Sequence, residues 1–112
     1  MKSEIKKLWI DALRSEKYKQ GTHRLRSSDN EYCCLGVLCD LHRRRMKKKG
    51  WVSNIDMGLK SYLGQTAYLP ETVRKWAGLD KNSPFVGHQV LTGMNDSGIS
   101  FKDISDTIER YL

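Results

Sequence analysis

The chain has 112 residues and a mass of 13.0 kDa, which is the size of one domain and leaves no room for a second core. Its apolar share of 38%, counted without the nine glycines, is ordinary for a globular chain and argues against intrinsic disorder. No apolar run approaches the roughly 18 residues of a membrane helix, and the charges within MKSEIKKLWI argue against a secretory signal. We therefore expect a single domain over residues 1–112, located in the cytoplasm and without a membrane segment.

The net charge of +7 belongs to the first half of the chain. Residues 1–49 hold fourteen Lys and Arg against six Asp and Glu, a net charge of +8, whereas residues 50–112 hold six against seven, a net charge of −1. A positive field on one part of a protein attracts anionic partners and says nothing about the fold. The charge therefore predicts nucleic acid, a nucleotide or an acidic protein surface as the class of partner.

The spacing of apolar residues predicts an amphipathic helix that begins at Ser3. The residues of its buried stripe recur at helical spacing and are Ile5, Leu8, Trp9, Ala12 and Leu13. Ile10 falls outside this stripe, among the cations of the opposite face. It is either an isolated exposed residue, which is common, or the apolar centre of a basic contact face.

A short β-hairpin is predicted near residues 18–33, because the helical period ends after Tyr18. Gly21 and the Ser-Ser-Asp-Asn cluster at residues 27–30 are typical turn residues between short extended segments. The first arm of this hairpin is almost wholly basic and carries Lys19, Gln20, His23, Arg24 and Arg26. Arginine grips phosphate in a bidentate way, so this arm is where we expect an anionic group to bind.

A second helix is predicted over residues 33–49, with Gly50 as the residue that ends it. Its buried face carries Cys34, Val37, Leu38 and Leu41. The last turns hold a basic run that consists of Arg43, Arg44, Arg45, Lys47, Lys48 and Lys49. These cations span more than one turn and cannot share a face, so this end projects into solvent, where it either complements the helix dipole or binds a partner.

The remaining chain predicts a loop and three shorter helices. Residues 51–68 show no clear period, and we expect a loop with short strands. Pro70 and Gly78 bracket a helix of about two turns that buries its apolar residues. A further helix is predicted from Ser83-Pro84 to near Met94, followed by a turn at residues 95–98.

The last helix begins at Ser100, which stands in a near capping-box relation to Asp103. Its buried stripe consists of Phe101, Ile104 and Ile108, with Leu112 extending it. The expected fold class is therefore mainly α (α+β), a small single domain of four to five helices with a short β-hairpin near residues 18–33.

Catalytic and metal chemistry find little support in the motifs. Among Cys33, Cys34, Cys39 and His42, only Cys39 and His42 face the same way on a helix, and the paired C-x-x-C of a zinc site is missing. The odd number of cysteines also argues against a disulfide framework. A thiol at a helix N-terminus has a lowered pKa, but no arrangement of His residues supplies a base for Cys33 or Cys34. We expect no metal, no cofactor and no enzyme activity, with a Cys-dependent enzyme as the last alternative.

Non-catalytic binding of an anionic ligand is the function that the residues favour. The expected ligand contacts are Lys19, Gln20, Arg24 and Arg26, with Tyr32, Asn95 and Asp96 as secondary contacts and the basic run, Arg43, Arg44, Arg45, Lys47 and Lys48, as a secondary partner-binding set. Asn95 and Asp96 have an alternative role, since such residues also satisfy backbone groups in turns and at helix ends. Direct nucleic-acid binding through the basic half is the second hypothesis.

Three segments carry a resemblance to a known group of proteins, and they read EYCCLGVLCDL, YLPETVRKWAGL and MNDSGISFKDISDTIE. In this order and spacing the chain resembles a group of short proteins found mainly in bacteriophage and prophage genomes. The resemblance implies a phage origin and the cytoplasm of the host bacterium as the location. Small phage accessory proteins without catalytic motifs are often binders, so the resemblance also implies interference with host machinery or defence. The implied partner is a host defence protein or complex, or an anionic nucleotide ligand.

Overall fold

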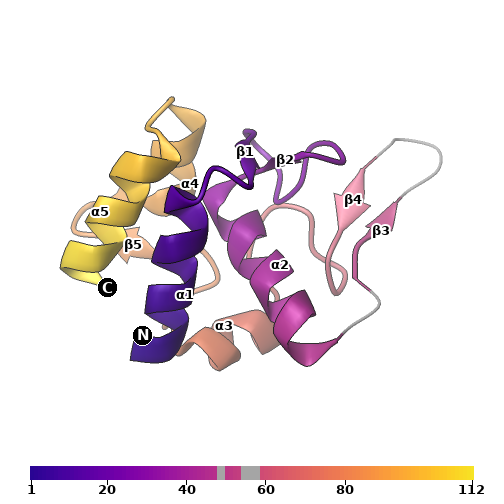
Figure 1. Ribbon diagram of the computed structural model, residues 1–112, viewed down its shortest axis with the longest axis horizontal. Helices are drawn as coiled ribbons and strands as arrows, with labels where there is room; N and C mark the ends of the chain where they lie inside the picture. Colours follow the sequence, from indigo (N-terminus) through magenta and orange to yellow (C-terminus); the bar gives the residue numbers. More distant parts are fainter. Residues whose placement is uncertain (48–49, 54–58) are drawn as a thin grey trace.

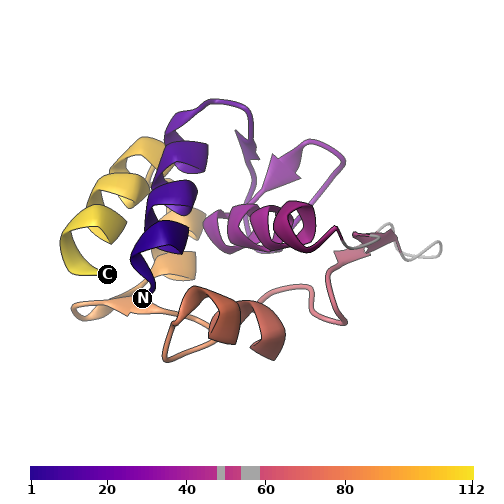
Figure 2. The same cartoon turned by 60° about the horizontal axis from the view of Figure 1, so that its bottom comes forward.

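The computed structural model describes residues 1–47, 50–53 and 59–112. Within these ranges the chain forms five helices around one hydrophobic core, and the expected mainly α class with α+β character is confirmed (Figure 1). The helices are α1 (Ser3–Arg14), α2 (Cys34–Met46), α3 (Glu71–Ala77), α4 (Leu91–Asp96) and α5 (Phe101–Tyr111). Figures 1 and 2 show α5 beside α1, α2 on the other side of α1, and α3 across the lower ends of α1 and α2.

Short strands of two residues form three separate pairs in the described part of the chain. The pairs are β1 (Lys19–Gln20) with β2 (Glu31–Tyr32), β3 (Val52–Ser53) with β4 (Lys60–Ser61), and β5 (Phe85–Val86) with β6 (Gln89–Val90). β3–β4 and β5–β6 are antiparallel. The β3–β4 pair confirms the expectation of short strands after residue 51, although residues 54–58 of that segment lie outside the described ranges.

Paired strands are present where a hairpin was expected, but β1 and β2 run parallel, with Gln20 opposite Tyr32. The antiparallel partner of Tyr32 is Arg26, through an isolated bridge on its other side. The turn residues 27–30 therefore reverse the chain between Arg26 and Tyr32. Because the chain also turns between β1 and Arg26, β2 runs parallel to β1. The turn was correctly located, and Arg26 of the expected first arm pairs antiparallel across it, whereas Lys19 and Gln20 of that arm run parallel to β2.

The buried face of α1 is rotated by about 60° from the predicted stripe. Ile10 is buried, together with Ile5, Trp9 and Leu13, whereas Leu8 and Ala12 are only partly buried. The cause is α5, which packs beside α1 and covers the side that carries Ile10. The side chain of Arg14, one turn after Ile10, donates from Nε to Ser105 Oγ of α5 at 2.9 Å. The expectation that Ile10 is exposed is therefore wrong.

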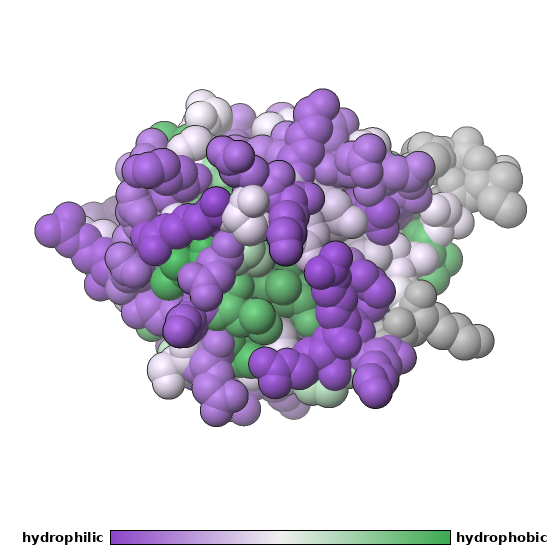
Figure 3. Space-filling view, in the orientation of Figure 1, coloured by the Kyte–Doolittle hydropathy of each residue, from purple (hydrophilic) through white to green (hydrophobic). Residues whose placement is uncertain are grey.

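On its other side, α1 borders a hollow that α2 and α3 also line. Hydrophobic atoms are visible in the middle of this face and hydrophilic side chains surround them (Figure 3). Ile5, Met46 and Trp76 are among the residues that line the hollow. Leu8 and Ala12 pack against the core only in part, which agrees with their place on the edge of the buried face.

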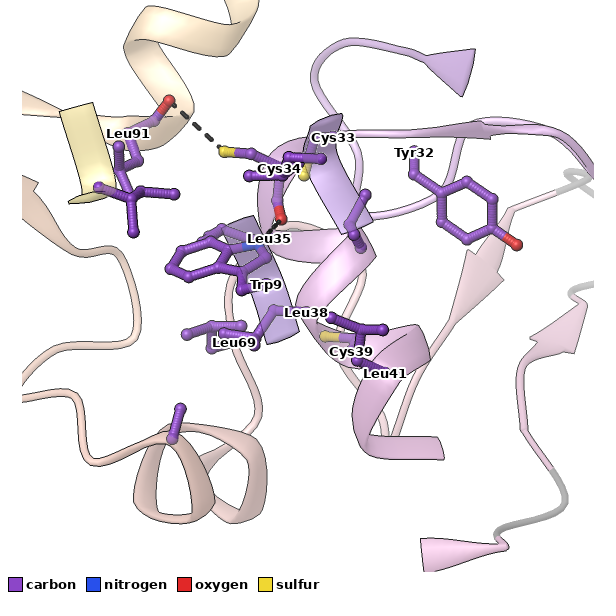
Figure 4. Packing of buried hydrophobic residues seen from close by; sticks show 14 of the residues in the cluster. Trp9, Tyr32, Cys33, Cys34, Leu35, Leu38, Cys39, Leu41, Leu69 and Leu91 are labelled. Carbon is purple, nitrogen blue, oxygen red and sulfur yellow. Dashed lines mark hydrogen bonds between the residues drawn. The ribbon is translucent and has the colours of Figure 1, made fainter. Parts of the chain in front are cut away.

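α2 is the central helix, and its first turn is almost completely buried. The indole N–H of Trp9 donates to the Cys34 carbonyl at 2.9 Å, and the Cys34 thiol lies 3.8 Å from the Leu91 carbonyl (Figure 4). Gly36 faces the backbone of Leu25, and a Cβ at this position would lie 1.7 Å from the Leu25 carbonyl oxygen. A glycine is required here because of that close approach. The first turn of α2 can therefore pack directly against the backbone of Leu25, because Gly36 has no side chain to keep them apart.

The end of α2 lies earlier than predicted. The helix stops at Met46, and Lys47 adopts the left-handed conformation at φ 52°, with its N–H donating to the carbonyls of Arg43 and Arg44. Gly50, which was expected to cap the helix, also has a positive φ of 102° but follows after the cap. Residues 48 and 49 lie outside the described ranges.

The later helices agree with the sequence in part. α3 and its left-handed Gly78 cap, and α5 with Ser100 Oγ accepting from the Asp103 N–H at 3.2 Å, are confirmed. The helix predicted from Ser83-Pro84 to Met94 is wrong in its first half, which is the β5–β6 hairpin with Gly87 at φ 64°. α4 begins only after this hairpin and continues through residues 95 and 96, which were expected to form a turn.

Candidate functional site

Asn95 is fully buried and holds three segments of the chain together. Its Nδ2 donates to the Gly21 carbonyl at 2.8 Å, while its Oδ1 accepts from the Cys34 backbone N–H at 3.2 Å and from Gln20 Nε2 at 3.0 Å. Because each amide atom is engaged within the protein, a ligand reaches Asn95 only if the core opens. The role in satisfying backbone groups, one of the two weighed from the sequence, is the one the geometry supports.

Gln20 extends this network to α5. Its Nε2 also donates to the Ile99 carbonyl at 2.7 Å, and its Oε1 accepts from the Phe101 backbone N–H at 3.1 Å. Gln20 therefore holds β1 against the start of α5. The structure brings Gln20, Asn95 and Asp96 together, and the first two serve mainly to position the loop that follows β1.

That loop carries Arg24, and its backbone is fixed on both sides of this residue. The His23 N–H donates to Asp96 Oδ1 at 2.8 Å, and the Leu25 N–H donates to the Thr66 carbonyl at 2.7 Å. His23 adopts a left-handed conformation at φ 69°, which is rare for a residue with a Cβ. Arg24 is exposed, and its side chain makes no hydrogen bond or ion pair with any other described residue.

Arg24 lines a small hollow of about 90 Å³, which we call the Arg24 hollow. The residues around it are His23, Arg24, Cys33, Ala67, Tyr68, Thr92 and Asp96. A wider cleft of about 640 Å³ adjoins it, because Tyr68 and Thr92 line both spaces. A cation without an ion-pair partner therefore lies next to a space large enough for a small ligand.

The cleft, which we call the aromatic cleft, was missed by the sequence analysis. Tyr68 and Phe85 line it and are large aromatic residues exposed to 54% and 51%. Residues 51–68 have no period to indicate which side chains face outward, and Phe85 was assigned to a helix. The only sequence signal was the presence of two aromatic residues beside turn-forming Gly and Pro.

Lys19 lies elsewhere, in a hollow of about 570 Å³ between the end of α1, β1 and the start of α5. Arg14 and Lys102 line this hollow too, but both pair with Asp106, at 2.6 and 3.6 Å. Glu16 adds a negative charge to the lining. The structure therefore separates Lys19 from Arg24, and it leaves the Lys19 hollow with less uncompensated positive charge than its cations suggest.

Arg26 and Tyr32 form a stack inside the fold. The Arg26 guanidinium lies 4.9 Å from the Tyr32 ring centre and 5.5 Å from that of Trp51. It also donates to the carbonyls of Ser28 and Asp29, at 3.2 and 2.7 Å. Tyr32 is buried, and its pKa is raised mainly by that burial. Both residues shape the turn, so neither is presented to a ligand as Arg24 is.

Asp40 accounts for part of the basic run. Its carboxylate, buried to all but 3%, accepts from Tyr18 Oη at 2.6 Å, from Arg43 Nε at 2.8 Å and from the Trp51 indole at 3.1 Å, and it pairs with Arg44 at 3.4 Å. Arg45 and Lys47 make no ion pair with the described residues, and Lys48 lies outside them. The uncompensated positive charge at the end of α2 is therefore smaller than the number of Arg and Lys residues in the basic run suggests.

The three cysteines are free and buried. Burial raises the pKa of the Cys33 thiol to about 11, although Cys33 lies at the N-terminus of α2, and burial also raises the pKa values of Cys34 and Cys39. Desolvation outweighs the helix dipole here, which weighs against a thiolate nucleophile. Within the described residues, no group of three His, Cys, Asp or Glu side chains is arranged to hold a metal ion.

Comparisons with known proteins place the chain in a family without naming an activity. No helix of the described residues has the length and apolar character needed to cross a bilayer. Neither the curated proteins nor the solved structures gave a match. A family model described as a domain of unknown function (DUF8296) matches residues 1–112. Because the match covers the whole of the sequence in hand, the chain belongs to the DUF8296 family.

Proposed function

We propose that this protein is a non-catalytic binding protein, and that its ligand carries a phosphate or a comparable anionic group held at the Arg24 hollow. One observation carries the proposal: Arg24 is exposed and without an ion pair among the described residues, on a loop whose backbone is fixed at His23 and Leu25. A guanidinium held in this way offers two parallel N–H donors to an anion.

Asp96 sets the side from which the anion approaches. Its Oδ1 accepts from the His23 N–H at 2.8 Å and lies 3.3 Å from Asn95 Nδ2, so this oxygen is engaged within the protein. A negative charge in the same hollow repels a second anion, and the ligand therefore lies on the Arg24 side. In this proposal Asp96 positions the loop through the His23 N–H, and the direct ligand contact expected from the sequence stays a prediction.

The resemblance to short phage proteins supplies the proposed biological role. In that role the protein acts in the cytoplasm of the host bacterium and interferes with host machinery or defence. It does so by holding a nucleotide signal or by binding an acidic host complex. The small, partly preformed hollow favours the first of these two ligands, because a protein surface makes contacts over a far larger area.

Titration with inorganic pyrophosphate tests the binding site directly. We expect binding to the wild-type protein by calorimetry and a loss of at least about tenfold in affinity for Arg24→Glu, since a charge-assisted pair is replaced by a repulsion. Arg45→Glu is the matched control, because Arg45 is also exposed and has no ion pair among the described residues, but lies at the far end of α2. Equal affinities of the wild type and Arg24→Glu would contradict the proposal.

A plaque assay on a defence-bearing bacterial host tests the role. We expect expression of the wild-type protein to restore phage growth and Arg24→Glu to abolish that effect. Arg26 is left unchanged in this test, because its stacking on Tyr32 and Trp51 would confound binding with folding. A folded Arg24→Glu protein with full activity would remove the Arg24 hollow from the mechanism.

Direct nucleic-acid binding is a second candidate, which the unpaired cations at the end of α2 favour. Arg45 and Lys47 are exposed there, and no described acidic residue pairs with them. This function predicts an affinity for duplex or single-stranded oligonucleotides that falls steeply with salt, as counterions are released. It also predicts that Arg45→Glu, neutral in the pyrophosphate titration, weakens oligonucleotide binding. Absent or salt-insensitive binding would exclude it.

A further inference from the structure

We infer that the aromatic cleft binds a planar heteroaromatic ring, so that the ligand is a nucleotide with its base in this cleft and its phosphate at Arg24. The inference rests on the proposed function, because the phosphate position is the one proposed there. It adds a binding site for the base next to the phosphate site, and the residues of this second site are aromatic and polar, so the charge pattern of the sequence does not point to them.

The lining of the cleft has the character of a ring-binding site. Tyr68 and Phe85 are about half exposed, although large aromatic side chains are normally covered by the core. The lining also includes Leu69, which is buried to all but 1%. Its volume of about 640 Å³ is within the range of small-molecule sites. Aromatic side chains exposed beside such a space are suited to stacking with a base. The Lys81 ammonium lies over one face of the Phe85 ring, 5.7 Å from its centre.

The cleft is held open by hydrogen bonds among its own residues. Asn82 Nδ2 donates to the Leu69 carbonyl at 2.6 Å, and the Leu69 N–H donates back to the Asn82 carbonyl at 2.9 Å. Phe85, which also lines the cleft, belongs to the β5–β6 hairpin, and the Leu91 N–H after this hairpin donates to the Pro84 carbonyl at 3.0 Å. A ring entering the cleft therefore meets walls that are already in place.

Polar groups along the cleft can read the edge of a base. The hydroxyls of Ser83 and Thr92 lie 3.4 Å apart, a long contact that either can exchange for a ligand atom. Gln65 also lines the cleft, is exposed, and carries both a donor and an acceptor. Few, well-placed polar groups in an apolar lining are what gives such a site its preference among rings.

Charge orients the ligand along the two joined spaces. Glu71 lines the aromatic cleft but not the Arg24 hollow, and its carboxylate is held ionised by Arg74, at 2.7 and 2.9 Å. Because Arg74 compensates the charge of Glu71, the charge that distinguishes the linings of the two spaces is the exposed guanidinium of Arg24, which lines only the Arg24 hollow and attracts a phosphate there. Tyr68 and Thr92, which line both spaces, are the link between them. The base therefore takes the aromatic cleft and the phosphate takes the Arg24 hollow.

Calorimetric titration with three probes tests the inference: ADP, inorganic pyrophosphate and adenosine, with GDP, CDP and UDP to show base preference. We expect the best nucleoside diphosphate to bind at least about tenfold more tightly than pyrophosphate, because stacking of one base contributes on that scale. Phe85→Ala should reduce its affinity to the pyrophosphate level, and Tyr68→Phe, which keeps the ring, should not. Tyr111→Ala is the matched control, because Tyr111 is exposed to 62% at the end of α5, outside the cleft.

The outcomes separate this inference from the proposed function. If pyrophosphate binds through Arg24 but no nucleoside diphosphate binds more tightly, the aromatic cleft is not a base site and the proposed function stands. If Phe85→Ala and Tyr111→Ala have equal effects, the inference is likewise overturned. If adenosine or a nucleoside diphosphate binds in a way that needs Phe85 but not Arg24, the ring site stands and the anion site falls. Absence of binding by every probe overturns both.

Discussion

The Tyr18 hydroxyl donates a hydrogen bond of 2.6 Å to the carboxylate of Asp40, and this pair joins the segment between α1 and β1 to the middle of α2. The hydroxyl is one of four groups around a carboxylate that is 3% exposed. A buried carboxylate is stable as an anion only when its oxygens are occupied in this way. Asp40 thus connects Tyr18, the last turns of α2 and Trp51 through one negative charge.

This arrangement predicts how stability depends on pH. Burial alone raises the pKa of Asp40, but hydrogen bonds from Arg43, Tyr18 and Trp51 outweigh it, and the pKa lies below its ordinary value. The stabilisation is therefore present above the pKa of the unfolded chain, about 3.9, and is lost as the pH falls through the folded value. We expect Asp40→Asn to lower the free energy of unfolding by about 1–3 kcal/mol at pH 7, and by less at pH 3.

Urea unfolding at the two pH values measures this difference. Asp11→Asn is the control, because Asp11 is exposed on α1 and forms no ion pair with the described residues. A destabilisation by Asp40→Asn that is the same at both pH values would show that the charge of Asp40 has no part in it.

Gly36 predicts a steric effect. A Cβ added there would lie 1.7 Å from the Leu25 carbonyl oxygen and 2.6 Å from its carbonyl carbon, which are backbone atoms that cannot rotate away. We expect Gly36→Ala to lower the free energy of unfolding by about 3 kcal/mol or more, measured by thermal or urea unfolding. Gly93→Ala is the matched helical control, because its Cβ would meet only a Val90 methyl at 3.1 Å, and it should change stability by at most about 1 kcal/mol. Similar effects of the two substitutions would contradict the close approach.

Arg24 and Arg26 lie two positions apart, and replacing each with alanine should affect stability to different extents. Arg26→Ala removes two hydrogen bonds and the contacts with the rings of Tyr32 and Trp51, so we expect a loss of about 1–2 kcal/mol in stability. Arg24→Ala should leave stability within about 0.5 kcal/mol, since its side chain has no partner among the described residues. The unfolding midpoints of the two variants decide this, and equal destabilisation would remove Arg24 as a residue free to bind.

The cysteine thiols should be unreactive in the folded protein. With a Cys33 pKa of about 11, only about one thiol in a thousand is ionised at pH 8, and all three thiols are buried. We expect labelling by Ellman's reagent to be slow in buffer and to reach three thiols in denaturant. Rapid labelling of a single cysteine in the native protein, lost in Cys33→Ser, would restore the Cys-dependent alternative.

Elements whose ends are determined locally could be predicted from the sequence. The left-handed conformation of Gly78 follows from its lack of a Cβ, and the Ser100 cap follows from its hydroxyl; α3 and α5 were found on that basis. Elements set by packing could not be predicted. Ile10 is buried because α5 lies next to it, and β2 pairs in parallel with β1 while Tyr32 also forms an antiparallel bridge with Arg26. Both contacts join residues that are distant in the sequence, and no local sequence pattern indicates them.

The residues of the candidate site likewise fall into those that the sequence indicated and those that only the fold reveals. Lys19, Gln20, Arg24 and the Asn95-Asp96 pair were recognised from charge and polarity, but charge does not distinguish a cation that packs from one that is free. Arg26 packs and Arg24 does not, because only Arg26 faces Tyr32 and Trp51. Tyr68 and Phe85 were missed because an aromatic residue in a sequence is normally part of a core, and only the fold shows that these two lie at the surface.

The hydrogen bonds on either side of Arg24 also bear on kinetics. The backbone of this loop loses its freedom when the chain folds, through the N–H groups of His23 and Leu25, so a ligand has only the Arg24 side chain left to order. Association should then occur in a single step, with an observed rate that rises linearly with ligand concentration and shows no plateau. The left-handed turn at His23 would in this way set the speed of recognition as well as its geometry.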